Sequence, residues 1–429
     1  MKNFTLLALS ATIAALPLAA NAQRQNAQVQ NARKTAAIIG KAFGIKRSCN
    51  PQRTMVAGKT YQPGTVKEYQ YTGSTMEYTL TRNFTYDQYG NVLSTTWCDA
   101  DGVKTGTKYK YDTVETSYLV LRTQESYASA VDREPEHIYV DKRTDVTRNN
   151  KGQLTGIAYY GPNNSYTGLV DEGKIDITYG SDGKANSISM TMYDEDGNMA
   201  ITLKDIIWET YNGNLLGMLD EYMEKSVFDS GNLIKSANVS MMGDGMEIAG
   251  TATGTYNGPE RELALSFEYY GMTMAETSFY YKSTDDNGSY ITIEKSSTMG
   301  TPPEAYGETV VYNDRKDIIE ESESEGTSAD DLAVQESKKY EYTYNESTGL
   351  ADYCFVKKLD KTSGNYNPSQ KLEFSNYKEI GAGITTATAA TGKTAVYNTN
   401  GIYAGSSTAN LPSGLYIVKQ GAKSFKIMK

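Results

Sequence analysis

Apolar and polar residues alternate along most of this chain, in runs of strand length that are separated by short turn sequences. Successive side chains of a β-strand point to opposite faces, so a period of two predicts strands with one buried and one water-facing side. Antiparallel sheet is the expected result. The clearest runs are Met76/Tyr78/Leu80, Ile175/Ile177/Tyr179, Ile188/Met190/Met192, Leu263/Leu265/Phe267/Tyr269 and Tyr340/Tyr342/Tyr344.

The residues between the runs are typical of tight hairpin turns. Asp-Gly and Asn-Gly pairs tolerate the positive φ that such turns require, and no long amphipathic helix interrupts the runs. We therefore predict an all-β domain of antiparallel hairpins over residues 61–380, forming an extended or curled sheet or a closed barrel. The pairs are Asp101-Gly102, Asp182-Gly183, Asp196-Gly197, Asn212-Gly213 and Asn287-Gly288.

The turns belong to a recurring motif in which an aromatic residue ends the incoming strand, Asp or Asn opens the turn and Gly closes it. The stretch from Tyr86-Asp87 to Gly90-Asn91 is the clearest copy, and looser copies begin at Tyr179, Tyr193, Tyr211 and Phe228. Over roughly residues 66–380 this pattern resembles the tyrosine-aspartate (YD, or RHS-type) hairpin repeats of bacterial surface proteins. We interpret the motif as scaffold, and expect any specific activity in segments that depart from it, such as 127–137 or 317–331.

Tyrosine is unusually common, with 35 residues. Tyr suits a pleated, half-buried surface, and cross-strand aromatic pairs stabilise sheets, so we assign most of these residues to packing. An exposed row of Tyr side chains that binds a glycan or a peptide is the alternative.

The N-terminus has the features of an export signal. Lys2, the apolar run Leu6 to Leu18 and the small residues before Ala22 predict a signal peptide over residues 1–22, recognised by the Sec export machinery and cleaved between Ala22 and Gln23. Its removal changes the formal net charge from -10 to -11, because Lys2 is its only charged residue. No later stretch is long and apolar enough for a membrane-spanning helix. Residues 23–60 are predicted to be a polar, poorly ordered tether, with a cleaved pro-segment as the alternative.

The composition changes again over residues 384–429, for which we predict a small β module of three short strands. It resembles the end of the type A C-terminal sorting domain of the type IX secretion system of Bacteroidetes, although it lacks a clear Pro-Asn-Pro opening. The resemblance implies delivery across the outer membrane to the cell surface by the type IX machinery. An ordinary final hairpin is the alternative. The matching residues are Val396, Tyr397, Gly401, Leu411, Gly414, Leu415, Tyr416, Ile417 and Val418.

Several kinds of chemistry lack the residues they need. His137 is the only histidine, which excludes multi-histidine metal sites and His-based triads that need a base elsewhere in the chain; we expect it at the surface. Cys49, Cys98 and Cys354 are too few for a disulfide framework, although two of them could form a single disulfide. At least one of the three is expected to be a buried residue that packs as a small apolar side chain. The acidic run at 317–331 is predicted to be a solvated loop.

The acidic net charge argues against nucleic acid as a partner, and no motif predicts a cofactor or a metal. The sequence thus favours an exported, non-enzymatic binding or structural protein of the cell surface. A secreted glycan-processing enzyme that uses two carboxylates is the alternative. An outer-membrane barrel is disfavoured because the strands are polar and the chain ends in Lys429.

Overall fold

The computed structural model describes residues 54–380 and four strands of the C-terminal segment. Within the first range it leaves out residues 115–117, 164–166, 194–198, 214, 220–227, 229–230, 244–245 and 301. The predicted cleavage site at Ala22 and Gln23 lies outside the described residues, as do Cys49 and the Asp196-Gly197 turn. In the described part, no helix is long and apolar enough to cross a membrane.

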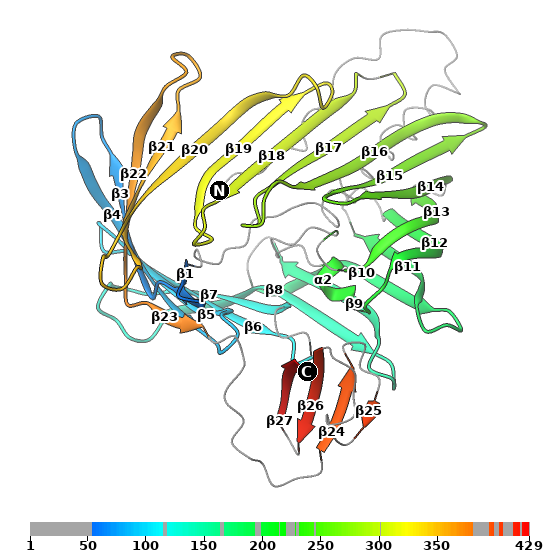
Figure 1. Cartoon of the computed structure of the whole chain (residues 1–429), viewed down its shortest axis with the longest axis horizontal. Helices are drawn as coiled ribbons and strands as arrows, with labels where there is room; N and C mark the ends of the chain where they lie inside the picture. The colour runs from blue at the N-terminus through cyan, green and yellow to red at the C-terminus, as the bar shows by residue number, and fades with distance from the viewer. Residues whose placement is uncertain are drawn as a thin grey trace.

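Twenty antiparallel strands, β3 to β22, form a closed barrel, which confirms the predicted all-β class and decides between an open sheet and a barrel (Figure 1). Each strand pairs with its sequence neighbours, and β22 pairs with β3 to close the ring. The strands are β3 (Thr65–Tyr71), β4 (Met76–Tyr86), β5 (Val92–Asp99), β6 (Lys104–Tyr111), β7 (Leu119–Ser126), β8 (His137–Arg148), β9 (Leu154–Pro162), β10 (Leu169–Tyr179), β11 (Ala185–Met192), β12 (Met199–Thr210), β13 (Leu233–Gly243), β14 (Met246–Asn257), β15 (Glu260–Tyr269), β16 (Met272–Ser283), β17 (Tyr290–Thr298), β18 (Glu304–Tyr312), β19 (Ile318–Gly326), β20 (Ala333–Tyr344), β21 (Ala351–Leu359) and β22 (Tyr366–Ser375).

Three smaller elements accompany the barrel. A three-stranded sheet joins β1 (Thr54–Val56), β2 (Lys59–Gln62) and β23 (Lys378–Ile380), so the end of the expected tether forms strands. The helix α2 (Leu215–Leu219) lies between β12 and β13 in the chain. A separate four-stranded sheet contains β24 (Thr394–Asn398), β25 (Tyr403–Gly405), β26 (Leu415–Gln420) and β27 (Lys423–Met428).

The repeat motif is explained by its hydrogen bonds at the turns. In the first copy, one carboxylate oxygen of Asp87, Oδ1, accepts hydrogen bonds from the backbone N–H groups of Tyr89 (2.7 Å) and Asn91 (2.9 Å). Gly90 has a φ of 84°, a left-handed conformation that glycine adopts without steric cost. The Asp and Gly of the motif therefore shape hairpin turns, as the sequence predicted.

The aromatic residue of the motif joins the two ends of a hairpin. Near the end of the second strand, its polar group donates a hydrogen bond to the backbone carbonyl of a residue at or near the start of the first strand. The pairs are Tyr86 to Pro63 (2.7 Å), Tyr111 to Val92 (2.9 Å), Tyr179 to Leu154 (2.7 Å), Trp208 to Ala185 (2.7 Å), Tyr256 to Ile234 (2.7 Å) and Tyr377 to Ala351 (2.9 Å). This repeated bond supports the structural role that we assigned to most tyrosines.

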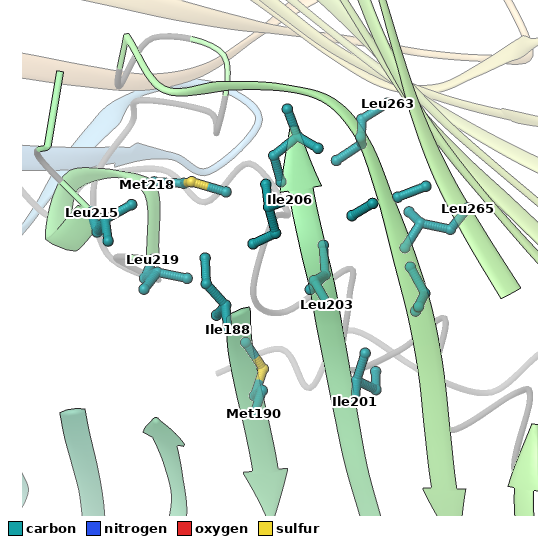
Figure 2. Close-up of a cluster of buried hydrophobic side chains, with 14 of the residues drawn as sticks. Ile188, Met190, Ile201, Leu203, Ile206, Leu215, Met218, Leu219, Leu263 and Leu265 are labelled. Atoms are coloured by element: carbon teal, nitrogen blue, oxygen red, sulfur yellow. The ribbon is translucent and has the colours of Figure 1, made fainter. Parts of the chain in front are cut away.

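The apolar core lies on the inner face of the barrel. Buried residues from Leu154 of β9 to Val310 of β18 form a single cluster together with the helix α2. Side chains of a curved sheet converge only on its concave side, and Figure 1 draws α2 within the ring of strands. Figure 2 shows Leu219 of this helix near Ile188 of β11.

One predicted loop is a strand. The acidic run that composition assigned to a solvated loop contains β19, whose residues pair with β18 and β20. The prediction was wrong because charge content was given more weight than the alternation Glu321-Ser322-Glu323-Ser324-Glu325, which has the period of a strand. In contrast, residues 127–136 connect β7 and β8 outside any strand, as expected.

Candidate functional site: the inner wall

The inner face of the barrel is apolar along one part of the ring and charged along another. Directly opposite residues of an antiparallel pair place their side chains on the same face, so the register identifies inward residues beyond the apolar cluster. Tyr281 and Tyr290 belong to that cluster, and they stand opposite Thr292 and Val310, respectively. Val310 in turn stands opposite Glu321. The wall formed by β17 to β20 therefore faces inward with charged residues.

Glutamates on this wall stand opposite one another on consecutive strands. Glu308 of β18 pairs with Glu323 of β19, which pairs with Glu336 of β20. Glu321 lies two residues from Glu323 on the same face, and Glu294 stands opposite Phe279, a residue of the apolar cluster. We call these five glutamates (294, 308, 321, 323 and 336) the acidic face.

Contacts at one side of the acidic face compensate part of its charge. The Tyr340 hydroxyl donates a 2.7 Å hydrogen bond to Glu321 Oε2. The ammonium groups of Lys338 and Lys358 lie 3.1 Å and 3.3 Å from Glu336 Oε1. Burial disfavours the ionised form of Glu336, but the two lysines outweigh it and lower its pKa.

Glu294 has the opposite electrostatic environment. Burial beside the apolar half of the barrel raises the pKa of its carboxyl to about 7. This carboxyl can therefore hold or release a proton near neutral pH. Glu308 and Glu323 stand directly opposite each other, an arrangement of like charges that is unfavourable unless neighbouring groups compensate it. Among the described residues, no three His, Cys, Asp or Glu side chains are placed to hold a metal ion.

The Tyr row of β20 lies on the same inner wall. Tyr342 stacks on Tyr344 with ring centroids 5.8 Å apart and on Phe374 at 6.4 Å, and the Tyr344 hydroxyl donates to Asp317 Oδ2 at 2.9 Å. Tyr340, Tyr342 and Tyr344 are all half-buried. The contacts of Tyr342 and Tyr344 fit a packing role.

The tail residues that resemble a sorting domain are partly brought together. Val396 of β24 stands opposite Val418 of β26, and Tyr397 stands opposite Ile417. Val396, Tyr416 and Val418 form a small buried cluster, whereas Leu415 is exposed. Gly401, Leu411 and Gly414 lie outside the described residues, and none of the six matched residues that the structure describes belongs to the inner wall.

The remaining single residues have ordinary environments. His137 is exposed at the start of β8, as predicted, and its Nε2 lies 3.8 Å from Glu136 Oε1. Cys98 and Cys354 are both free thiols. Cys354 is fully buried, and burial raises the pKa of its thiol to about 12, which matches the expectation of a buried apolar cysteine.

The acidic face was missed at the level of sequence. Its glutamates come from four strands and are joined only by register, so no contiguous motif contains them. The one local signal was the Glu-Ser alternation of β19, which places Glu321, Glu323 and Glu325 on one side of a strand.

No protein-family model matches the chain, and no curated protein matches it. Among solved structures, a porin-like protein from Bacteroides uniformis is similar over 74% of this chain and 97% of its own, at 9% sequence identity and a TM-score of 0.25. A likeness of that degree transfers no function to this chain.

Proposed function

We propose that this chain is an exported, non-enzymatic barrel protein of the bacterial cell surface. Its outer wall faces water, and its inner wall binds a ligand. The signal-like start and the sorting-like tail support routing through the Sec and type IX machineries. The barrel supplies the binding or structural module.

The distribution of polarity across the barrel wall carries this proposal. On β10, Ile175 and Ile177 are buried inside, whereas Lys174 and Asp176 form an exposed 2.7 Å ion pair outside. A barrel embedded in lipid has the reverse order, with an apolar band outside and polar residues inside.

Charged pairs also occur at other places on the outer wall. Exposed ion pairs on the outer wall join Lys282 to Glu260 at 2.8 Å and Lys357 to Glu341 at 2.5 Å. A Lys or Arg facing lipid at the bilayer centre costs about 2–4 kcal/mol, so a wall with many such residues is stable only in water.

Membrane fractionation tests the water-facing wall. We expect alkaline carbonate to release the protein from envelope fractions without detergent. Retention in the bilayer until detergent is added would contradict the proposal.

Surface labelling tests the routing. In a type IX-competent host, a tagged chain should be accessible to external protease, and a chain lacking residues 384–429 should remain inside the outer membrane. Equal surface delivery of the two forms would refute the role of the tail.

A further inference from the structure

Large apolar side chains are exposed together at one rim of the barrel, the rim where each odd-numbered strand of the ring connects to the next strand. At or beside three neighbouring connections, those after β13, β15 and β17, lie Met242, Tyr270, Met272 and Met299. They are 51%, 86%, 51% and 39% exposed, respectively. We call these four residues the tip patch. Soluble proteins rarely expose large apolar groups together, and such groups mark surfaces that bind a partner.

Three consecutive hairpins bring the tip patch together. β13 pairs with β14 so that Met242 stands opposite Glu247, and β14 in turn pairs with β15 from Ala249 onward. The backbone N–H of Met299 donates a 2.9 Å hydrogen bond to the carbonyl of Met274, which joins the end of β17 to the start of β16. The four side chains therefore occupy neighbouring hairpin tips along one stretch of the rim.

Tyr270 occupies a turn position that does not suit it. Tyr270 and Gly271 have φ angles of 50° and 74°, so both residues of this tight hairpin turn are left-handed. Asn, Asp and Gly adopt that conformation readily, whereas a bulky aromatic residue adopts it at a cost. The side chain of Tyr270 is almost fully exposed, so burial in the barrel does not offset this cost. Contact with another molecule gives the ring a use, and strained residues cluster at ligand-binding sites.

The flanks of the tip patch are acidic. Glu247 and Glu268 are exposed on the outer face beside it, and neither forms an ion pair with any Lys or Arg that the structure describes. The stretches 236–260, 262–281 and 296–314, which contain the three hairpin tips, have no Lys or Arg. Elsewhere on the outer wall, lysines stand beside glutamates. The patch therefore combines exposed apolar groups with negative charge that the chain leaves uncompensated.

These properties define the chemistry of the partner. Methionine side chains adapt to irregular apolar surfaces, and an exposed tyrosine offers an apolar ring with a polar edge. The complementary surface is apolar and flanked by Lys or Arg, which is the pattern of a basic amphipathic helix. An anionic bilayer and a second copy of this rim are both repelled by Glu247 and Glu268.

We propose that the tip patch docks a basic amphipathic segment of a partner protein. Tyr270 and Met272 are the apolar anchors, and Glu247 and Glu268 pair with Lys or Arg side chains of the partner. The patch lies at the rim and on the outer face of the barrel. This interaction is therefore separate from ligand binding by the inner wall, and either proposal can fail alone.

Fluorescence anisotropy of a labelled peptide tests the docking. The probe is an amphipathic peptide of about 18 residues, or roughly five helical turns, with Leu on one face and Lys on the other. We expect it to bind the purified protein, and to bind less tightly as salt is added. Equal binding of a scrambled peptide with the same composition would show attraction by charge alone and would overturn the proposal. Sedimentation of the protein with phosphatidylcholine vesicles, lost on Tyr270→Asn, would assign the patch to lipid instead.

Substitution of the anchors locates the binding. Tyr270→Asn/Met272→Ser should weaken binding of the probe by roughly tenfold, because a few apolar anchors dominate interfaces of this kind. Asn suits the left-handed turn, so this variant should be as stable as the unaltered protein in a denaturant melt. The matched control is Tyr89→Ser/Leu93→Ser, two exposed residues at the opposite rim, which should bind normally. Equal weakening by both double variants would refute the assignment to the tip patch.

Substitution of the flanking charges tests the preference for a basic partner. Glu247→Gln/Glu268→Gln should weaken binding of the probe by about fivefold at low salt and reduce its dependence on salt. The matched control, Asp286→Asn/Glu346→Gln, removes two exposed carboxylates at the opposite rim and should have no effect. Unchanged binding to the Glu247→Gln/Glu268→Gln variant, or tight binding of a peptide with Glu in place of every Lys, would contradict a basic partner.

Discussion

The Tyr179 hydroxyl donates a 2.7 Å hydrogen bond to the backbone carbonyl of Leu154. Tyr179 ends β10 and Leu154 begins β9, so the bond links the two ends of one hairpin at the same rim. Burial raises the pKa of Tyr179, which keeps its hydroxyl protonated as a donor at physiological pH. Equivalent bonds recur around the ring, so the tyrosines of the repeat hold hairpins together.

Removing this donor should weaken the barrel. Tyr179→Phe leaves the Leu154 carbonyl without its partner, and we expect the free energy of unfolding to fall by about 1–2 kcal/mol. Urea denaturation followed by circular dichroism measures the change. Tyr89→Phe, at an exposed turn position, is the control and should be neutral; an equal loss in both variants would count against the rim bond.

Glu294 should make stability depend on pH. The pKa of Glu294 rises from 4.5 in the unfolded chain to about 7 in the fold. The stability that its protonated carboxyl contributes to the fold is therefore fully present below pH 4.5 and is lost as pH rises through 7. Above pH 7 the fold has to bury an ionised carboxylate, and Glu294→Gln removes that cost. The substitution should therefore stabilise the protein by roughly 1–3 kcal/mol at pH 8, with little change at pH 4.

Thermal melts of the two proteins at both pH values measure this effect. Glu262→Gln on the outer wall, beside Lys295 at 3.3 Å, is the control and should show no such gain. A gain for Glu294→Gln that is equal at pH 4 and pH 8 would contradict the assignment.

The two described cysteines should differ in reactivity. Cys354 is buried with a pKa of about 12, so its thiol should not react with iodoacetamide in the folded protein, whereas the half-buried Cys98 should react slowly. Mass spectrometry of peptides labelled before and after denaturation reads each site separately. Labelling of Cys354 at the rate of Cys98 in the native protein would show that this wall opens.

Gly254 allows close approach of a rim tyrosine. A Cβ atom at this position would overlap the Ile234 carbonyl and the Tyr256 hydroxyl, which are joined by a 2.7 Å hydrogen bond. Gly254→Ala should therefore destabilise the protein by about 2–4 kcal/mol, the range of disrupted buried contacts. Gly168→Ala, whose nearest neighbour is a side-chain nitrogen at 3.6 Å, is the matched control for a denaturant melt and should be nearly neutral.

The secondary structure was largely readable from the sequence. Period-two runs such as Ile175/Ile177/Tyr179 are strands in the structure, and Gly102, Gly183, Gly213 and Gly288 have the positive φ that their turn sequences predicted. These features are local, because strand alternation and turn conformation depend on residues a few positions apart. The prediction of a solvated loop at residues 317–331 was wrong because it was based on charge content and overlooked the strand-like alternation of β19.

Closure of the barrel and the choice of its inner face came from tertiary structure. Closure pairs Gln70 with Gln370, residues 300 positions apart, and no local pattern specifies that contact. Alternation separates two faces of each strand without saying which becomes concave, and the packing of apolar residues around α2 makes that choice. The sequence by itself determined the hairpins and their turns, whereas the acidic face exists only because register around a closed ring places Glu308, Glu323 and Glu336 side by side.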